Sequence, residues 1–318
     1  MAKLYLGSRE ITPILKMGEP KAFNVDGYDW LGEINAQGTL VSPTKDLNIV
    51  FTGVKDLSGS IFYNFFSSDS RLKSISFPDL ESISGDSACL RGFRYSALSS
   101  VSFPKLASIS GDSVFQMAFN STNIENLSFP ELLTITGTGV FSNAISSNNI
   151  IKTISFPKLT SAASNTFYQL AQNSTTEEAS FPLLTTIGDS GFRLAFANSS
   201  LETLNLNSLT TAGNNVFDSA LYGTNIRIIS FPSLTTVGSK CFTKMVSGHN
   251  FSPILTDIYF NSLNSNSFGG NTDCFNNMLD EAPNVTVHFP IGLEATIGNW
   301  SDVLAGFGGT NTTILYDL

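Results

Sequence analysis

A short motif, Ser-Phe-Pro followed two residues later by Leu, returns along most of this chain and constrains its fold more than any other feature. The phenylalanine position recurs every 25 to 29 residues; it is occupied by Phe51, Phe77, Phe103, Phe129, Phe156, Phe181, Leu206, Phe231, Phe260 and Phe289. A fixed period of this length is the signature of a solenoid, in which each unit is too small to bury its apolar side chains alone and stacks on its neighbours. We therefore predict one elongated repeat domain of about ten stacked coils.

Each repeat predicts the same local elements. An apolar residue two positions before the phenylalanine alternates with small polar residues, which is the pattern of a short strand with one buried side. The proline fits the end of that strand, and the glycine that follows, as in Gly85 and Gly111, predicts a turn with a positive φ or a close backbone approach. A second Phe and a further apolar residue four positions later, as in Phe115 and Phe119, predict a short helix. The expected fold class is an α/β solenoid of strand, turn and short-helix coils, with the phenylalanines Phe77, Phe103, Phe129, Phe156, Phe181 and Phe231 in one buried column.

The unit from Ser180 to Phe192 resembles the BspA-like leucine-rich repeat, in which a strand ends in Pro and is followed by Leu-x-x-Ile-Gly and then Phe. The similarity extends over about residues 46–292. This chain departs from that pattern by its longer period, by Phe in place of Ile before the proline, and by the absence of the usual Cys. The resemblance implies a leucine-rich-repeat-like stack and a bacterial surface adhesin.

The segments outside the period divide the chain into three parts. Residues 1–45 lack the repeat and are expected to attach the protein to an assembly through Tyr28 and Trp30, or alternatively to cap the first coil. The solenoid covers 46–292. Residues 293–318 are expected to form a C-terminal cap, with Trp300, Val303, Leu304 and Phe307 on a closing helix and 313–316 as a last strand.

Composition limits the classes of partner that this protein is expected to bind. A net charge of −9 without any Lys/Arg cluster argues against nucleic acid, and no apolar run is long enough to cross a membrane. The opening residues contain no continuous apolar region of a secretory signal, which favours synthesis in the cytoplasm. The cysteines Cys89, Cys241 and Cys274 are widely scattered and are predicted to be free, buried thiols.

The residues that could suggest a catalytic or metal site are better explained by their positions in the repeat. Gly188-Asp189-Ser190-Gly191 is similar to the surroundings of a serine nucleophile, but the same point of other repeats reads Gly-Asp-Ser at Asp86 and Asp112, which indicates turn chemistry. Those aspartates are interpreted as turn-stabilising rather than as calcium ligands. His249 and His288 have no ligand partners at metal spacing and are expected to be surface residues. We expect no enzyme activity and no cofactor.

The outward side chains of the predicted strands form a candidate binding surface for a partner. The outward strand column is mostly serine and changes to Tyr259 and His288 in the last coils, which offer larger contact areas. These two residues are the candidate contacts to a protein or a cell-surface glycan. Two functions stay open: a bacteriophage virion structural or host-recognition protein, joined to other virion proteins through residues 1–45 and compatible with a homo-oligomer in that assembly, and a bacterial cell-surface adhesin. The corresponding locations are the virion, after synthesis in the host cytoplasm, and the bacterial surface.

Overall fold

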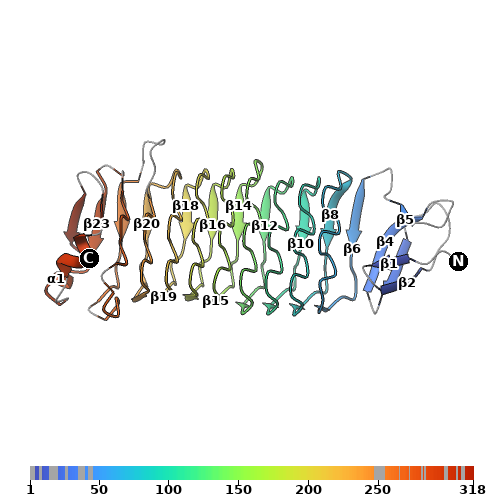
Figure 1. Ribbon diagram of the computed structural model, residues 1–318, viewed down its shortest axis with the longest axis horizontal. Helices are drawn as coiled ribbons and strands as arrows, with labels where there is room; N and C mark the ends of the chain where they lie inside the picture. Colours follow the sequence, from blue (N-terminus) through green and yellow to red (C-terminus); the bar gives the residue numbers. More distant parts are fainter. Residues whose placement is uncertain are drawn as a thin grey trace.

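The computed structural model describes strand backbone within residues 4–41 and, beyond it, residues 46–246, 255–264, 266–271, 273–280, 282, 284–296, 300–305, 307–308 and 312–318. The chain forms an elongated parallel β-solenoid of about ten coils, with β1 and the C-terminus at opposite ends (Figure 1). A separate antiparallel sheet stands at the N-terminal end, in the order β1-β2-β3-β4-β5. Its strands are β1 (Leu4–Leu6), β2 (Arg9–Pro13), β3 (Lys21–Val25), β4 (Tyr28–Ile34) and β5 (Leu40–Val41).

The first face of the solenoid is built from the strands that precede the repeated phenylalanine. They are β6 (Leu47–Val50), β8 (Leu72–Ser76), β10 (Ser100–Ser102), β12 (Asn126–Ser128), β14 (Thr153–Ser155), β16 (Glu178–Ser180), β18 (Thr203–Asn205), β20 (Ile228–Ser230), β22 (Asp257–Tyr259), β23 (Thr286–Phe289) and β24 (Thr313–Tyr316). The hydrogen-bonded ladder is interrupted between β10 and β12 and between β18 and β20, so this face consists of three parallel sheets.

The second face is one continuous parallel sheet of two-residue strands. They are β7 (Asp56–Leu57), β9 (Ser82–Ile83), β11 (Ser108–Ile109), β13 (Thr134–Ile135), β15 (Ser161–Ala162), β17 (Thr186–Ile187), β19 (Thr211–Ala212) and β21 (Thr236–Val237). The second residue of each strand points inward and is buried, while the first is a Ser, Thr or Asp on the surface. The period-two pattern thus produces two sheets that share one core.

The phenylalanines form two stacked columns inside the solenoid. In the first column, Phe129 and Phe156 lie parallel with ring centroids 5.3 Å apart, and Phe156 and Phe181 are 5.2 Å apart. The second column, which includes Phe141 and Phe167, meets the first edge to face. Phe103 and Phe129 stack at 5.3 Å across the first ladder interruption, so the core is continuous where the sheet is not. The prediction of one buried phenylalanine column is confirmed.

The third side of each coil corrects the prediction of a short helix. The segment that contains the second Phe is a chain of turns, with a residue of left-handed conformation at every fourth position, such as Ser87, Arg91 and Tyr95. The amides of Cys89, Arg91 and Phe93 donate to carbonyls of the next coil at 2.9, 2.9 and 3.1 Å, whereas the amides between them bond within their own turn. A four-residue turn repeat places residues i and i+4 on one side, as a helix does, and this explains the wrong α/β assignment.

Two short helices close the C-terminal end. They are α1 (Leu293–Thr296) and α2 (Trp300–Ala305), and β24 then pairs in parallel with β23. Trp300 packs edge to face on Phe289 at 5.2 Å, and its indole nitrogen donates to the Tyr316 hydroxyl at 2.6 Å. The aromatic column therefore ends on Trp300 and on Tyr316, whose ring stacks on Phe289 with centroids 6.2 Å apart.

The turn glycines have one of the two properties that the repeat predicts. Gly85 and Gly111 are not in the positive-φ region, so the second of the two predicted alternatives applies. The close approach is present: a Cβ on Gly137 would lie 2.0 Å from the carbonyl oxygen of Gly111 in the preceding coil. Glycine is needed here because neighbouring coils touch through their backbones.

Candidate interaction surfaces

Outward side chains at equivalent strand positions form columns along the first face, because the register of the ladder aligns them. The third strand position runs through Ser76, Ser102, Ser128, Ser155, Ser180, Asn205, Ser230, Tyr259, His288 and Leu315. The column is small and polar until Ser230 and then becomes large. The two residues that the sequence selected, Tyr259 and His288, are direct neighbours in this register.

The side chains of Tyr259 and His288 are held in place by contacts with each other and with two carboxylates. Their rings stack with centroids 4.2 Å apart and planes 11° apart. The imidazole Nδ1 lies 2.9 Å from a carboxylate oxygen of Asp317, and Nε2 lies 3.1 Å from Asp257 Oδ1. His288 is only 8% exposed, which corrects the expectation of an ordinary surface histidine. His249 lies outside the described residues.

The two carboxylates favour the charged imidazole. Burial lowers the pKa of His288, but the hydrogen bonds and negative charges of Asp317 and Asp257 outweigh it, and the net pKa is raised above its ordinary value. The pKa of Asp257 is lowered by its hydrogen bond from Thr256 and by His288. Because both ring nitrogens face carboxylate oxygens, both can donate only when the ring is protonated.

Two exposed aliphatic residues adjoin this cluster. Ile228, the register partner of Asp257, is 57% exposed, and Leu315, the register partner of His288, is 38% exposed. We call the combined surface the C-terminal face patch; it consists of Ile228, Asp257, Tyr259, His288, Leu315 and Asp317. Apolar side chains, an aromatic ring and two carboxylates are thus gathered at the end of a face that otherwise carries Ser, Thr and Asn.

The candidate attachment residues lie in the N-terminal sheet. Tyr28 and Trp30 are in β4, where their backbones pair with Val25 and Phe23 of β3. Their side chains lie outside the described part of the structure, so their role as anchors stays a prediction.

The aspartates that follow the turn glycines accept hydrogen bonds from backbone amides. Asp86 Oδ1 accepts a hydrogen bond from the Asp112 amide at 2.9 Å, Asp112 Oδ1 from the Thr138 amide at 2.7 Å, and Asp189 Oδ1 from the Asn214 amide at 2.8 Å. Each carboxylate joins its coil to the next one, whereas the sequence suggested a bond within its own turn. In the described parts of the chain, no group of three His, Cys, Asp or Glu side chains has the arrangement of a metal site.

The three cysteines are buried free thiols. Burial raises the pKa of Cys89 and Cys241 far above the ordinary value, and that of Cys274 to about 12. At neutral pH these side chains are therefore protonated core residues with little nucleophilic character.

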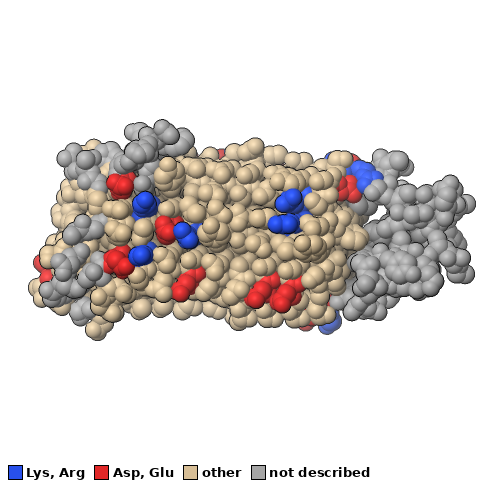
Figure 2. Space-filling view, viewed as in Figure 1, with Lys and Arg blue, Asp and Glu red and all other residues tan. Residues whose placement is uncertain are grey.

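Sequence reasoning missed a second surface, on the turns of the first two coils. Tyr63, in the first coil, and Tyr95, in the second, are about half exposed there, and Arg91 and Arg94 belong to the same turns as Tyr95. Charged side chains are sparse on the face of the solenoid in Figure 2. A signal was present in the sequence for Tyr95, since its position holds Ser, Asn or Gly in other coils, but a helical interpretation of the segment hid that alignment.

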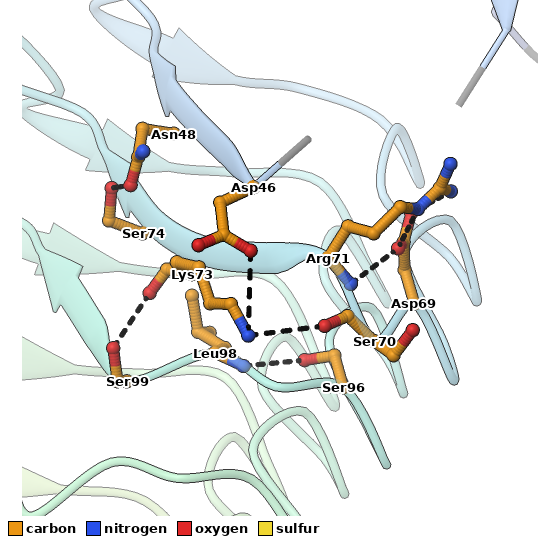
Figure 3. A network of polar contacts seen from close by, with 10 residues as sticks. All are labelled: Asp46, Asn48, Asp69, Ser70, Arg71, Lys73, Ser74, Ser96, Leu98 and Ser99. Atoms are coloured by element: carbon orange, nitrogen blue, oxygen red, sulfur yellow. Dashed lines mark hydrogen bonds and ion pairs between the residues drawn. The ribbon is translucent and has the colours of Figure 1, made fainter. Parts of the chain in front are cut away.

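Arg71, in the same region, is paired with a carboxylate (Figure 3). Arg71 Nε and one of its terminal nitrogens each donate to Asp69 at 2.9 Å. Nearby, Lys73 Nζ lies 3.7 Å from Asp46, and the Ser99 hydroxyl donates to the Lys73 carbonyl at 3.1 Å. These contacts tie the approaches to β6, β8 and β10 together.

Comparison with known proteins supports the repeat assignment. The model of the BspA type leucine rich repeat region matches in six copies, over residues 114–249 and 173–279, which together span more than half of the chain. No curated protein matches the sequence. No helix in the described residues has the length and apolar character needed to span a membrane. The repeat, its register and the family match lead to one conclusion: this chain belongs to the BspA-type leucine-rich repeat family.

Proposed function

We propose that this protein is a non-enzymatic interaction protein that binds a macromolecular partner through the C-terminal face patch. The observation that carries the proposal is the abrupt change of the outward column from serine to Tyr259, His288 and Leu315. A ring held by stacking, on a histidine fixed by two carboxylates, loses little side-chain entropy when a partner covers it. The expected partner is a protein or a cell-surface glycan.

The solenoid itself supplies a test, because the other coils show which residues the same positions tolerate. Ile228→Thr, Tyr259→Ser and Leu315→Ser replace patch residues by those of equivalent positions, such as Thr203 and Ser230. We expect the triple variant to fold normally and to lose at least about tenfold in affinity, as for central interface residues. Glycan arrays and a panel of immobilised extracellular proteins provide the partners, and Ser128→Ala in the same column is the control.

Equal binding by the triple variant and the wild type would move the site elsewhere. Loss of binding in Ser128→Ala as well would indicate a general effect on the sheet face. Thermal melting of each variant separates these results from unfolding.

Two biological settings remain for such a binding protein. Membership in the BspA-type family favours a bacterial cell-surface adhesin. The alternative, a bacteriophage virion structural or host-recognition component, rests on the short opening Leu4-Tyr5-Leu6-Gly7-Ser8, a pattern of low specificity. Mass spectrometry of purified virions and of peptides shaved from intact bacteria distinguishes the two, because the protein should be enriched in one sample.

A further inference from the structure

A second interaction surface lies on the turns of the first two coils, away from the face patch. Only three aromatic side chains in the described residues are exposed, namely Tyr63, Phe65 and Tyr95, at 48%, 37% and 52%. All three belong to these two coils. Solvent-exposed aromatic residues grouped with arginine are the composition of interface hot spots.

Tyr95 occupies a backbone position that disfavours it, a left-handed conformation with φ of 58°. Arg91 has a similar φ of 54°, but its position also holds long side chains in other coils, such as Met117 and Leu194. In equivalent turns of other coils, the position of Tyr95 holds small residues with the same φ: Ser68, Ser121, Ser147, Asn173, Asn198 and Gly223. A bulky side chain is unfavourable in this region, where Asn and Gly are best tolerated. Strain at an exposed position is a reason to look for a function there.

The two arginines have unused hydrogen-bonding capacity. The guanidinium of Arg94 lies over the ring of Tyr95, 4.5 Å from its centroid, which orients it. The Nε atoms of Arg91 and Arg94 are buried without a hydrogen-bond partner in the protein. No described carboxylate forms an ion pair with either residue, whereas Arg193 on the turns of a later coil donates to Asp218 at 2.9 Å.

The distribution of charge supports an acidic ligand here. Up to residue 105 the sequence has equal numbers of basic and acidic residues, 11 of each, and the excess of acidic residues lies entirely after that point. An anionic partner is therefore not repelled from the first coils as it would be from the later ones. A guanidinium oriented on an aromatic ring matches a carboxylate in geometry and charge.

From these observations we propose that Tyr63, Arg91, Arg94 and Tyr95 form a docking surface for an acidic segment of a partner protein, in which Asp or Glu carboxylates accept hydrogen bonds from the two guanidinium groups. This surface is independent of the C-terminal face patch. It gives the solenoid two binding regions, near opposite ends.

The test uses residues that the array already places at the same turns. The triple variant Arg91→Asn, Arg94→Gln and Tyr95→Ser introduces Asn as at Asn64 and Asn143, and Ser as at Ser68, at left-handed positions. Relief of strain should keep or raise its melting temperature while binding is lost. The matched control is Arg193→Gln, which removes a turn arginine that is already paired.

The full-length protein is panned against a random dodecapeptide library that has been depleted on the triple variant. We expect the recovered peptides to be enriched in Asp and Glu, and to bind the triple variant at least about tenfold more weakly than the wild type and the Arg193→Gln control. Recovery of no peptide, of peptides without acidic enrichment, or of peptides that bind the triple variant equally would overturn the proposal. Heparin serves as the competing probe: tight heparin binding that the triple variant loses, without acidic peptides, would assign the surface to an anionic glycan instead.

Discussion

Phe156 shows how much one side chain contributes to this core. It is fully buried and lies between Phe129 and Phe181 in the stacked column, with Phe141 and Phe167 against its edges. Truncation leaves a cavity that flanking rings held by two ladders cannot fill. We expect Phe156→Ala to lower the free energy of unfolding by about 3–5 kcal/mol. Urea unfolding measures this, with Leu183→Ala, at a half-exposed position, as the near-neutral control; a loss below about 1 kcal/mol would contradict a close-packed column.

The Asp257–His288–Asp317 cluster makes the C-terminal coils sensitive to pH. His288 has a raised pKa, so its stabilisation is complete below the ordinary value of 6.5 and is lost as the pH rises through the folded-state pKa. Asp257 has a lowered pKa, so its stabilisation is present above 3.8 and is lost as the pH falls through the folded-state pKa.

The cluster is therefore most stable from about pH 4 to 6.5. Amide hydrogen exchange of β22, β23 and β24 should accelerate above that range relative to β12 and β14. In His288→Gln this additional pH dependence should disappear. An unchanged difference between the two groups of strands in that variant would exclude the histidine as its cause.

Buried thiols give a separate residue-scale expectation. Because burial raises the pKa of all three cysteines, the native protein should react very slowly with a thiol reagent at pH 8. In denaturant without reductant, titration should count three thiols. A count of one would mean that two of them form a disulfide.

At the scale of the element, the turn glycines decide whether coils can approach each other. Ala at Gly137 would place its Cβ 2.0 Å from the Gly111 carbonyl oxygen, while the same change at Gly59, in the first coil of this column, meets nothing within 4 Å. We expect Gly137→Ala to cost about 1–3 kcal/mol or more, and Gly59→Ala to be neutral within about 0.5 kcal/mol. Thermal and urea unfolding of the pair measures the difference; equal effects would show that the backbones can separate without cost.

The elements also show what sequence patterns can predict here. Period two in the strands and period 26 along the chain gave the strand positions, the inward phenylalanines and the register of the outward column. The spacing of Phe115 and Phe119 did not distinguish a helix from consecutive turns, because both place every fourth residue inward. The Ser, Asn and Gly residues at the left-handed positions contained that information. The ion pairs of His288 could not be predicted from local sequence patterns, since Asp257 and Asp317 lie 31 and 29 residues away in sequence.

At the scale of the whole molecule, the described strands β1 to β5 form their own sheet, which shares no hydrogen-bonded ladder with the described strands of the solenoid. We expect deletion of residues 1–45 to leave a folded solenoid with a nearly unchanged melting temperature, and to abolish association with the virion or cell surface that carries it. Differential scanning calorimetry and co-purification measure the two effects. A marked fall in melting temperature would instead identify the segment as a cap on the first coil.

The coil-to-coil ladders also determine how the molecule responds to force. Strands β6 to β24 follow one another along the axis, and each coil is bonded only to its neighbours, so tension applied between the two ends loads one interface at a time. Each coil that peels away releases about 25 residues, or roughly 80 Å of chain. A solenoid of this kind is therefore expected to lengthen in steps under load, one coil at a time, and to dissipate mechanical work at each step.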